Sequence, residues 1–171
     1  MTFLPFSQAP EFLTWQDVEK LIDYLLPQLR GPYDALLMIT RGGIMPGGLI
    51  AEALDIRTIL TAAVEFPGAG QGRLSWPNFL QFPDDGLLND RRVLIVDDIW
   101  SHGRTITSVK GRVQGARGKP EAAVLHYKPG ASLFREAGPD YYAAVTDRFI
   151  IYPWEVQRGP DQIAATTPQP N

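Results

Sequence analysis

Two hydrophobic patterns alternate along the chain. Continuous apolar runs, which are typical of strands buried on both faces of a parallel sheet, predict strands at about 35–39, 92–96 and 122–127, and we expect a further strand at 57–64. Helical spacing of apolar residues predicts one helix over 15–26 and another that contains Ile106, Val109 and Val113, with a short helix over 46–54 between them. One or two helical turns are expected at 132–137, and short strands near 142–145 and 149–151. Strands that alternate with helices indicate an α/β fold with a doubly wound, mostly parallel sheet.

Turn and capping residues divide the chain further. Thr14 is a good N-cap for the first helix, and Asp17 three residues later resembles a capping box. Residues 66–90 contain four glycines and three prolines without regular periodicity, so we expect a long loop with room for a short hairpin. We expect one domain over 1–157, with its core at about 34–145, and a disordered polar tail over 158–171.

Length, charge and composition narrow the function. A chain of 171 residues suits one domain with one hydrophobic core. The formal net charge of -3 gives no basic surface for nucleic acid, so nucleic-acid binding is not expected. The absence of cysteine excludes disulfides, thiolate metal sites and cysteine nucleophiles. The N-terminus is a poor signal peptide and no apolar stretch is long enough to span a bilayer, so we expect a cytoplasmic protein with no membrane partner.

Three polar segments directly follow predicted buried strands. They are Arg41 with Gly42 and Gly43, then Asp97 with Asp98, and finally Lys128. Because ligands of doubly wound sheets bind at the carboxyl ends of the strands, we expect these segments to share one rim of the sheet.

The segment SHGRT, from Ser101 to Thr105, opens a predicted helix beside the acid pair. The first N–H groups of a helix and its dipole attract anions, above all phosphate. Gly103 allows close approach of the backbone, and Thr105 adds a hydroxyl. The alternative is a capped helix start with a flexible turn.

The acid pair itself suggests a sugar. Ionised carboxylates only accept hydrogen bonds, so Asp97 and Asp98 suit a sugar diol or the water shell of Mg²⁺. A ribose 5-phosphate would bridge the acid pair and the phosphate turn, whereas the alternative is a solvated acidic loop. Arg41, with the amides of the two glycines, suits a second anion such as pyrophosphate, although Gly-Gly is also common in plain turns.

Two other phosphate chemistries fit poorly. A nucleoside-triphosphate P-loop needs the motif GxxxxGK[ST], which the chain lacks. The string VLIVDD resembles the first strand of a response-regulator receiver, but that strand opens its domain, whereas here only 73 residues follow Asp98.

Four motifs together resemble a known family. VLIVDDIWSHGRT, at 93–105, is similar to the signature with which type I phosphoribosyltransferases bind 5-phosphoribosyl 1-pyrophosphate (PRPP). ITRGGIMPG resembles the pyrophosphate loop of the purine branch, notably the bacterial xanthine and hypoxanthine–guanine enzymes, and HYKPGA and FIIYPWE resemble its purine-binding segments. The four motifs follow the family's order and spacing over about 34–156.

This resemblance implies a fold and a reaction. The fold would be the family's parallel sheet with a small hood, built from about 140–157 with N-terminal residues as a further candidate, and with 66–90 as a lid over PRPP. The reaction would transfer the 5-phosphoribosyl group of PRPP to a purine and release pyrophosphate, with Mg²⁺ as cofactor, in an enzyme that is a dimer or larger homo-oligomer.

The resemblance also assigns residues. Asp97 and Asp98 would hold the ribose hydroxyls and contact metal with Glu155, mostly through water. The remaining groups would be the 5-phosphate site (Ser101, His102, Gly103, Arg104 and Thr105), the pyrophosphate site (Arg41, Gly42 and Gly43) and the purine site (Lys128 to the 6-oxo group, Phe149 stacked on the base, Ile150 through its backbone).

Ser101 departs from the family pattern. Purine enzymes of this branch usually carry an aspartate there, which contacts purine N7 and is thought to accept its proton. A serine hydroxyl can hydrogen-bond N7 but is a weak base at neutral pH. The sequence therefore leaves two functions open: a purine phosphoribosyltransferase of salvage, acting on hypoxanthine, guanine or xanthine, or a non-catalytic regulatory protein that binds PRPP or a nucleotide.

Overall fold

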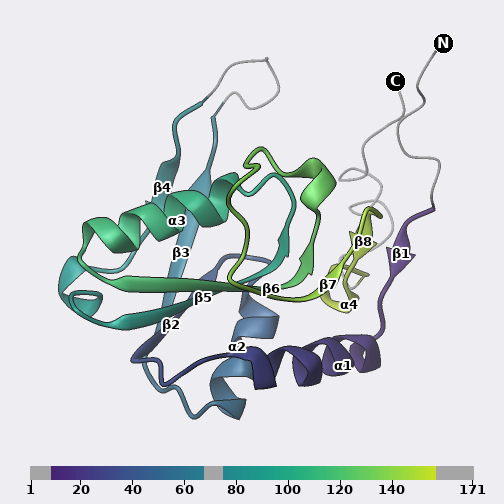
Figure 1. Cartoon of the computed structure of the whole chain (residues 1–171), viewed down its shortest axis with the longest axis horizontal. Coiled ribbons are helices and arrows are strands. Elements are labelled where there is room, and N and C mark those ends of the chain that lie inside the picture. The colour runs from purple at the N-terminus through teal and green to yellow at the C-terminus, as the bar shows by residue number, and fades with distance from the viewer. Residues whose placement is uncertain (1–8, 68–74, 157–171) are drawn as a thin grey trace.

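A six-stranded sheet forms the centre of the protein (Figure 1). The computed structural model describes residues 9–67 and 75–156. The strand order is β4-β3-β2-β5-β6-β7, with every pair parallel except β3 and β4. The strands are β2 (Ala35–Ile39), β3 (Ile59–Glu65), β4 (Asn78–Gln81), β5 (Arg92–Trp100), β6 (Lys119–Tyr127) and β7 (Tyr141–Val145). The predicted doubly wound, mostly parallel sheet is thus confirmed.

Helices cover both faces of this sheet. Helices α1 (Trp15–Leu25) and α2 (Ile44–Ala53) lie on one face and α3 (Arg104–Gly115) lies on the other (Figure 1). The first part of β5 is continuously apolar because both of its faces are buried. Leu94 and Val96 belong to the core under α1 and α2, while Val93 and Ile95 belong to the core under α3. Among the described residues, no helix is long and apolar enough to cross a membrane.

The first helix begins as its sequence predicts. The Thr14 hydroxyl accepts the backbone N–H of Asp17 at 3.2 Å, and the Asp17 carboxylate accepts the backbone N–H of Thr14 at 2.9 Å. This reciprocal pair is the capping box, which satisfies two N–H groups that the helix cannot satisfy itself.

Several boundaries differ from the prediction. β5 continues to Trp100, so the acid pair lies inside the strand and does not follow it, because the ladder to β6 continues through these residues. Residues 132–137 form no helix; a short 3-10 helix, η3 (Pro129–Ala131), precedes them, and the Ser132 hydroxyl instead accepts the backbone N–H of Phe134 at 3.3 Å. Within 66–90 the described residues form β4, which pairs antiparallel with β3, and η2 (Asp85–Leu87). The partner strand β3 lies before this stretch, so a hairpin within 66–90 stays a prediction.

A second, two-stranded sheet joins the two ends of the described chain. Strands β1 (Glu11–Phe12) and β8 (Ile150–Ile151) pair in parallel, and α4 (Pro153–Val156) follows directly. The strand expected at 149–151 therefore exists but belongs to this separate sheet, which lies beyond β7 in Figure 1. The predicted tail over 158–171 lies outside the described residues.

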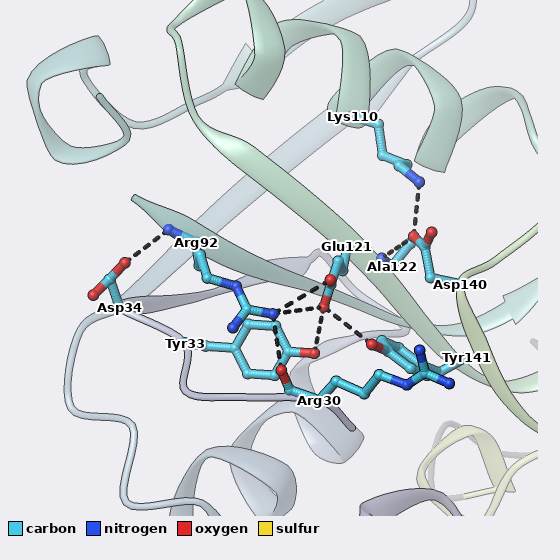
Figure 2. A network of polar contacts seen from close by, with 9 residues as sticks. All are labelled: Arg30, Tyr33, Asp34, Arg92, Lys110, Glu121, Ala122, Asp140 and Tyr141. Atoms are coloured by element: carbon cyan, nitrogen blue, oxygen red, sulfur yellow. Dashed lines mark hydrogen bonds and ion pairs between the residues drawn. The ribbon is translucent and has the colours of Figure 1, made fainter. Parts of the chain in front are cut away.

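A polar network ties the strands together at the rim opposite the predicted binding edge (Figure 2). Glu121, near the start of β6, accepts the hydroxyls of Tyr33 at 2.6 Å and Tyr141 at 3.1 Å. The guanidinium of Arg92 lies 3.4 Å from the same carboxylate and donates to the carbonyl of Arg30 at 2.8 Å. This network fixes the amino ends of β5, β6 and β7 and leaves the carboxyl ends for the site.

Candidate active site

The strand order reverses between β2 and β5, because the chain continues from β2 to one side and from β5 to the other. Ligands of doubly wound sheets usually bind at the carboxyl ends of the two strands at this switch point. Arg41, Gly42 and Gly43 follow β2, and Asp97 and Asp98 lie near the end of β5. Two of the predicted segments therefore meet at the switch point.

Contact between these segments is tight. A Cβ atom at Gly42 would overlap the carboxylate of Asp98, and one at Gly43 would overlap the carbonyl oxygen of Val96 on β5. Only glycine fits at either position without moving a neighbour, so the sequence Gly-Gly is explained by close packing against β5. The peptide bond between Thr40 and Arg41 is cis, and Arg41 is exposed.

The two acids are held in an environment that opposes their charge. The backbone N–H of Asp98 donates to the carboxylate of Asp97 at 2.9 Å. Burial, followed by the charge of Asp98, raises the pKa of Asp97. Burial, followed by the charge of Glu155, raises the pKa of Asp98 to about 7. Such a pair favours a ligand that brings positive charge.

The predicted phosphate turn lines a cavity of about 270 Å³ with Asp97. The cavity is lined by five consecutive residues of the turn (Ser101, His102, Gly103, Arg104 and Thr105) and by neighbouring apolar side chains. Gly103 has φ of 80° and its Cα faces the Trp100 ring so closely that a Cβ atom would overlap it. Because α3 begins at Arg104 without a side-chain cap, its first N–H groups are available to an anion.

Arg104 connects this turn to the loop between β3 and β4. Its guanidinium donates to the backbone carbonyl of Ser75 at 2.6 Å and lies 4.2 Å from the centre of the Phe66 ring. Sequence reasoning missed Phe66 and Ser75 as partners of this turn, since nothing in a loop sequence indicates which distant side chain it contacts.

The predicted base-binding residues lie around the end of β6 and the start of β8. The backbone N–H of Lys128 donates to the carbonyl of Trp100 at 2.8 Å, which places Lys128 next to the end of β5. Burial lowers the pKa of Lys128 and the charge of Asp147 opposes this effect. Phe149 is half-buried and Ile150 is buried in the small sheet. None of these side chains lines the cavity of the phosphate turn, and neither does Arg41.

Glu155 is the third acid of this region. Its carboxylate accepts the backbone N–H of Tyr152 at 2.9 Å, and its charge contributes to the raised pKa of Asp98. Over the described ranges, no group of three or more His, Asp or Glu side chains is close enough to hold a metal ion. Asp97, Asp98 and Glu155 therefore do not enclose a cation by themselves, and a metal here would need oxygens from a substrate or from water.

Comparison with known proteins identifies the family. A family model described as a phosphoribosyl transferase domain matches residues 9–157. The chain belongs to the phosphoribosyltransferase family. The xanthine-guanine phosphoribosyltransferase of Ruegeria sp. (strain TM1040) is 30% identical over 134 residues, which cover 74% of this chain and 70% of that protein.

Solved structures of phosphoribosyltransferases share the fold. The purine phosphoribosyltransferase from Pyrococcus horikoshii Ot3 is 31% identical, with a TM-score of 0.73 over 86% of this chain and 95% of that one. The xanthine-guanine-hypoxanthine enzyme of Helicobacter pylori, at 18% identity and a TM-score of 0.72, covers 92% of this chain and shows the fold alone. The predicted family, fold class and enzyme class are confirmed.

Proposed function

We propose that this phosphoribosyltransferase transfers the 5-phosphoribosyl group of PRPP to a 6-oxopurine and releases pyrophosphate, in purine salvage. The proposal rests mainly on one observation. At the switch point the acid pair contacts the glycine turn after β2 and shares a cavity with the amino-terminal turn of α3, which suits phosphate. The relatives, which include xanthine-guanine and purine phosphoribosyltransferases, support the purine as acceptor.

In this proposal each anionic part of PRPP has its own segment. The turn from Ser101 to Thr105 binds the 5-phosphate through the first N–H groups of α3 and the hydroxyl of Thr105. Arg41 and the amides of Gly42 and Gly43 bind the pyrophosphate. The ribose hydroxyls donate to Asp97 and Asp98 between these two sites.

The chemistry follows from the charges that develop. Breaking the bond between C1 and pyrophosphate leaves positive charge on the sugar, which the two carboxylates stabilise, and negative charge on the leaving group, which the amide donors stabilise. Carboxylate and phosphate oxygens are the ligands that Mg²⁺ prefers, so we propose Mg²⁺ bound by PRPP, with Asp97, Asp98 and Glu155 contacting it mostly through water. When bound, the ion would neutralise charge on the leaving pyrophosphate.

The loop over 66–90 is proposed as the lid that excludes water. Its segment 68–74 lies outside the described residues. The support comes from the two ends of that segment, since Phe66 and Ser75 both contact Arg104 of the phosphate turn.

The base is read by Lys128, directly after β6, and by residues of the expected hood, which we propose includes β1, β8 and α4. Lys128 donates to the purine 6-oxo group, Phe149 stacks on the base, and the backbone of Ile150 contacts its edge. The partial burial that lowers the pKa of Lys128 also strengthens a hydrogen bond to an uncharged oxygen acceptor.

A second function is favoured by one residue. Ser101 lines the cavity at the position where purine enzymes of this branch usually carry an acid. A serine there favours a protein that binds PRPP or a nucleotide and regulates a partner without catalysis. The experiment below separates the two functions.

We further propose a homo-oligomer that uses α2, and a cytoplasmic location, which suits a chain without cysteine. From Ile44 to Ala51 the helix carries no charged residue, yet Ile44, Met45 and Leu49 are each about two-fifths exposed. Helices that are apolar all round are normally covered, which supports a second copy of the chain as the partner of this face.

The test is nucleotide formation from PRPP and Mg²⁺ with hypoxanthine, guanine, xanthine or adenine, measured by chromatography of the 5′-monophosphates. We expect turnover with at least one 6-oxopurine, and loss of most activity in Asp98→Asn, which keeps the shape of the side chain. Tight calorimetric binding of PRPP without nucleotide from any of the four bases would support the regulatory function and refute the transfer reaction.

A further inference from the structure

Tyr152 connects the base-reading segment to the acid pair. Its side chain is 2% exposed, and its hydroxyl donates to the backbone carbonyl of Asp98 at 3.0 Å, across 54 positions of sequence. Burial, followed by the charges of Asp98, Asp97 and Glu155, raises the pKa of Tyr152, so the hydroxyl keeps its proton. A carbonyl only accepts, so the single O–H of Tyr152 is used in this bond.

His126 holds the hydroxyl from the other side. Its Nδ1 lies 2.9 Å from the Tyr152 oxygen, and because the tyrosine proton is used elsewhere, Nδ1 must carry the proton and donate. Burial, followed by the charge of Lys128, lowers the pKa of His126 to about 4, so the ring is neutral and has one N–H to give. His126 is itself 5% exposed on β6, in register with Ile99 of β5.

Aromatic packing holds the ring of Tyr152 in place. Trp154 stacks on it with ring centres 4.6 Å apart and planes 6° apart, and Trp15 of α1 packs against Trp154 at 5.9 Å. The backbone N–H of Tyr152 is bonded to Glu155. The ring, the hydroxyl and the main chain of this residue are therefore all held.

We infer that Tyr152 is a positioning residue, which sets the base-reading segment at a fixed distance from the ribose-binding acids, and that His126 orients its hydroxyl for this task. The inference rests on the proposed function, because it assigns the base to the segment around Phe149 and Ile150 and the ribose to Asp97 and Asp98. Alignment of base and C1 affects the chemical step more than the binding of either substrate alone. The signature is therefore a loss in kcat with little change in KM.

The first test compares two tyrosine hydroxyls. Tyr152→Phe should lower kcat about tenfold while the KM values for PRPP and for the base each change less than about threefold. Tyr33→Phe is the matched control, since it removes a hydroxyl bonded to Glu121 at the opposite rim (Figure 2) and should lower thermal stability without lowering kcat. Equal kcat values for the two variants would show that Tyr152 is merely structural and overturn the inference.

The second test uses His126. His126→Asn keeps a donor near the place of Nδ1 and should retain kcat within about threefold, whereas His126→Leu removes it and should behave like Tyr152→Phe. This pair also applies where Tyr152→Phe does not fold. Equal activity of the two His126 variants would overturn the role of His126 in orienting the hydroxyl.

A third measurement separates this inference from the proposed function. A purine 5′-monophosphate spans both subsites, so its Kd, measured by calorimetry, should rise about tenfold in Tyr152→Phe while the Kd of PRPP with Mg²⁺ changes less than threefold. If the wild-type protein forms no nucleotide from any base, the transfer reaction fails but the nucleotide Kd still tests Tyr152. An unchanged nucleotide Kd in Tyr152→Phe would overturn the inference.

Discussion

The acid pair should make the free protein less stable as the pH rises, and Asp98→Asn should remove much of that effect. Asp98 lies inside β5 with its carboxylate against Gly42, and burial raises its pKa from the ordinary 3.8 to about 7. Asparagine has the same shape and carries no charge. The substitution therefore tests the energetic cost of the ionised carboxylate with little change in packing.

The direction follows from proton binding. Between pH 3.8 and about pH 7 the folded protein keeps the proton of Asp98 while the unfolded chain has lost it. The folded state then binds more protons than the unfolded state, so the free energy of unfolding falls as the pH rises through this window, and the loss is complete above it. At about 1.4 kcal/mol per pH unit the full effect is about 4 kcal/mol. Residual solvent contact and sharing of the proton with Asp97 reduce this to about 2 kcal/mol.

The assay is urea unfolding at about pH 5 and about pH 8 in EDTA, followed by tryptophan fluorescence. Between pH 5 and pH 8, the free energy of unfolding of Asp98→Asn should rise relative to that of the wild-type protein by about 1 kcal/mol, because part of the effect of Asp98 is already present at pH 5. His126, whose pKa is lowered by burial to about 4, has the opposite effect on the pH dependence in both proteins, so the comparison between the two proteins is the test. Asp23→Asn, at an exposed position of α1, is the control and should keep the wild-type difference. An Asp98→Asn variant that shows the same difference between the two pH values as the wild-type protein would refute the reasoning.

Four further predictions concern other parts of the molecule. Ser101→Asp should raise kcat for purines, whereas Ser101→Ala should not, as measured by nucleotide formation; no rise in the aspartate variant would show that Ser101 does not limit the reaction. Gly103→Ala forces a side chain into the Trp100 ring at positive φ, and calorimetry should show at least tenfold weaker PRPP binding. Glu121→Gln weakens the network in Figure 2 and should lower the urea-unfolding free energy by about 1 kcal/mol with kcat unchanged. Leu49→Glu should convert an oligomer to a monomer in light scattering, and an unchanged mass would exclude α2 as the interface.

The central strands could be predicted because each is buried on both faces. The run ALLMI forms β2 over the predicted residues 35–39, and the first five residues of β5 also match. The capping box at Thr14 is equally local, since its two bonds join residues three positions apart. Patterns of this kind need no knowledge of the tertiary structure.

Elements that depend on distant partners could not be predicted. β1 has two residues and was not predicted, and although the strand near 149–151 was, its pairing with β1 was not, because the register joins Glu11 to Ile150 across most of the chain. The sequence also does not predict that β5 continues through its two aspartates, because adjacent aspartates are typical of loops. In the structure the ladder to β6 continues, pairing Asp97 with Val124 and Trp100 with Tyr127. Tertiary pairing overrides local propensity in both cases.

The candidate site divides in the same way. The acid pair and the two small-residue turns could be found because the carboxyl ends of parallel strands meet at one rim. The bond from Tyr152 to Asp98 could not, and neither could the contact of Arg104 with Ser75, because side-chain partners 54 and 29 positions apart leave no periodic signal. The residues that carry charge are visible in the sequence, whereas those that hold them in place are not.

The energetics of the acid pair link stability to the proposed reaction. Two carboxylates that are costly in the free protein are complementary to positive charge, and in a site of low dielectric constant this complementarity is stronger than in water. Burial and the neighbouring Glu155 raise the pKa of Asp98 and so weaken the free protein at neutral pH, while the same features favour a sugar that becomes positive as its bond to pyrophosphate breaks. Gly42 makes this possible, because any side chain there would displace the Asp98 carboxylate from the switch point. The cost in stability and the capacity for catalysis thus have one physical origin, as is common where a site is built for a charge that the free protein lacks.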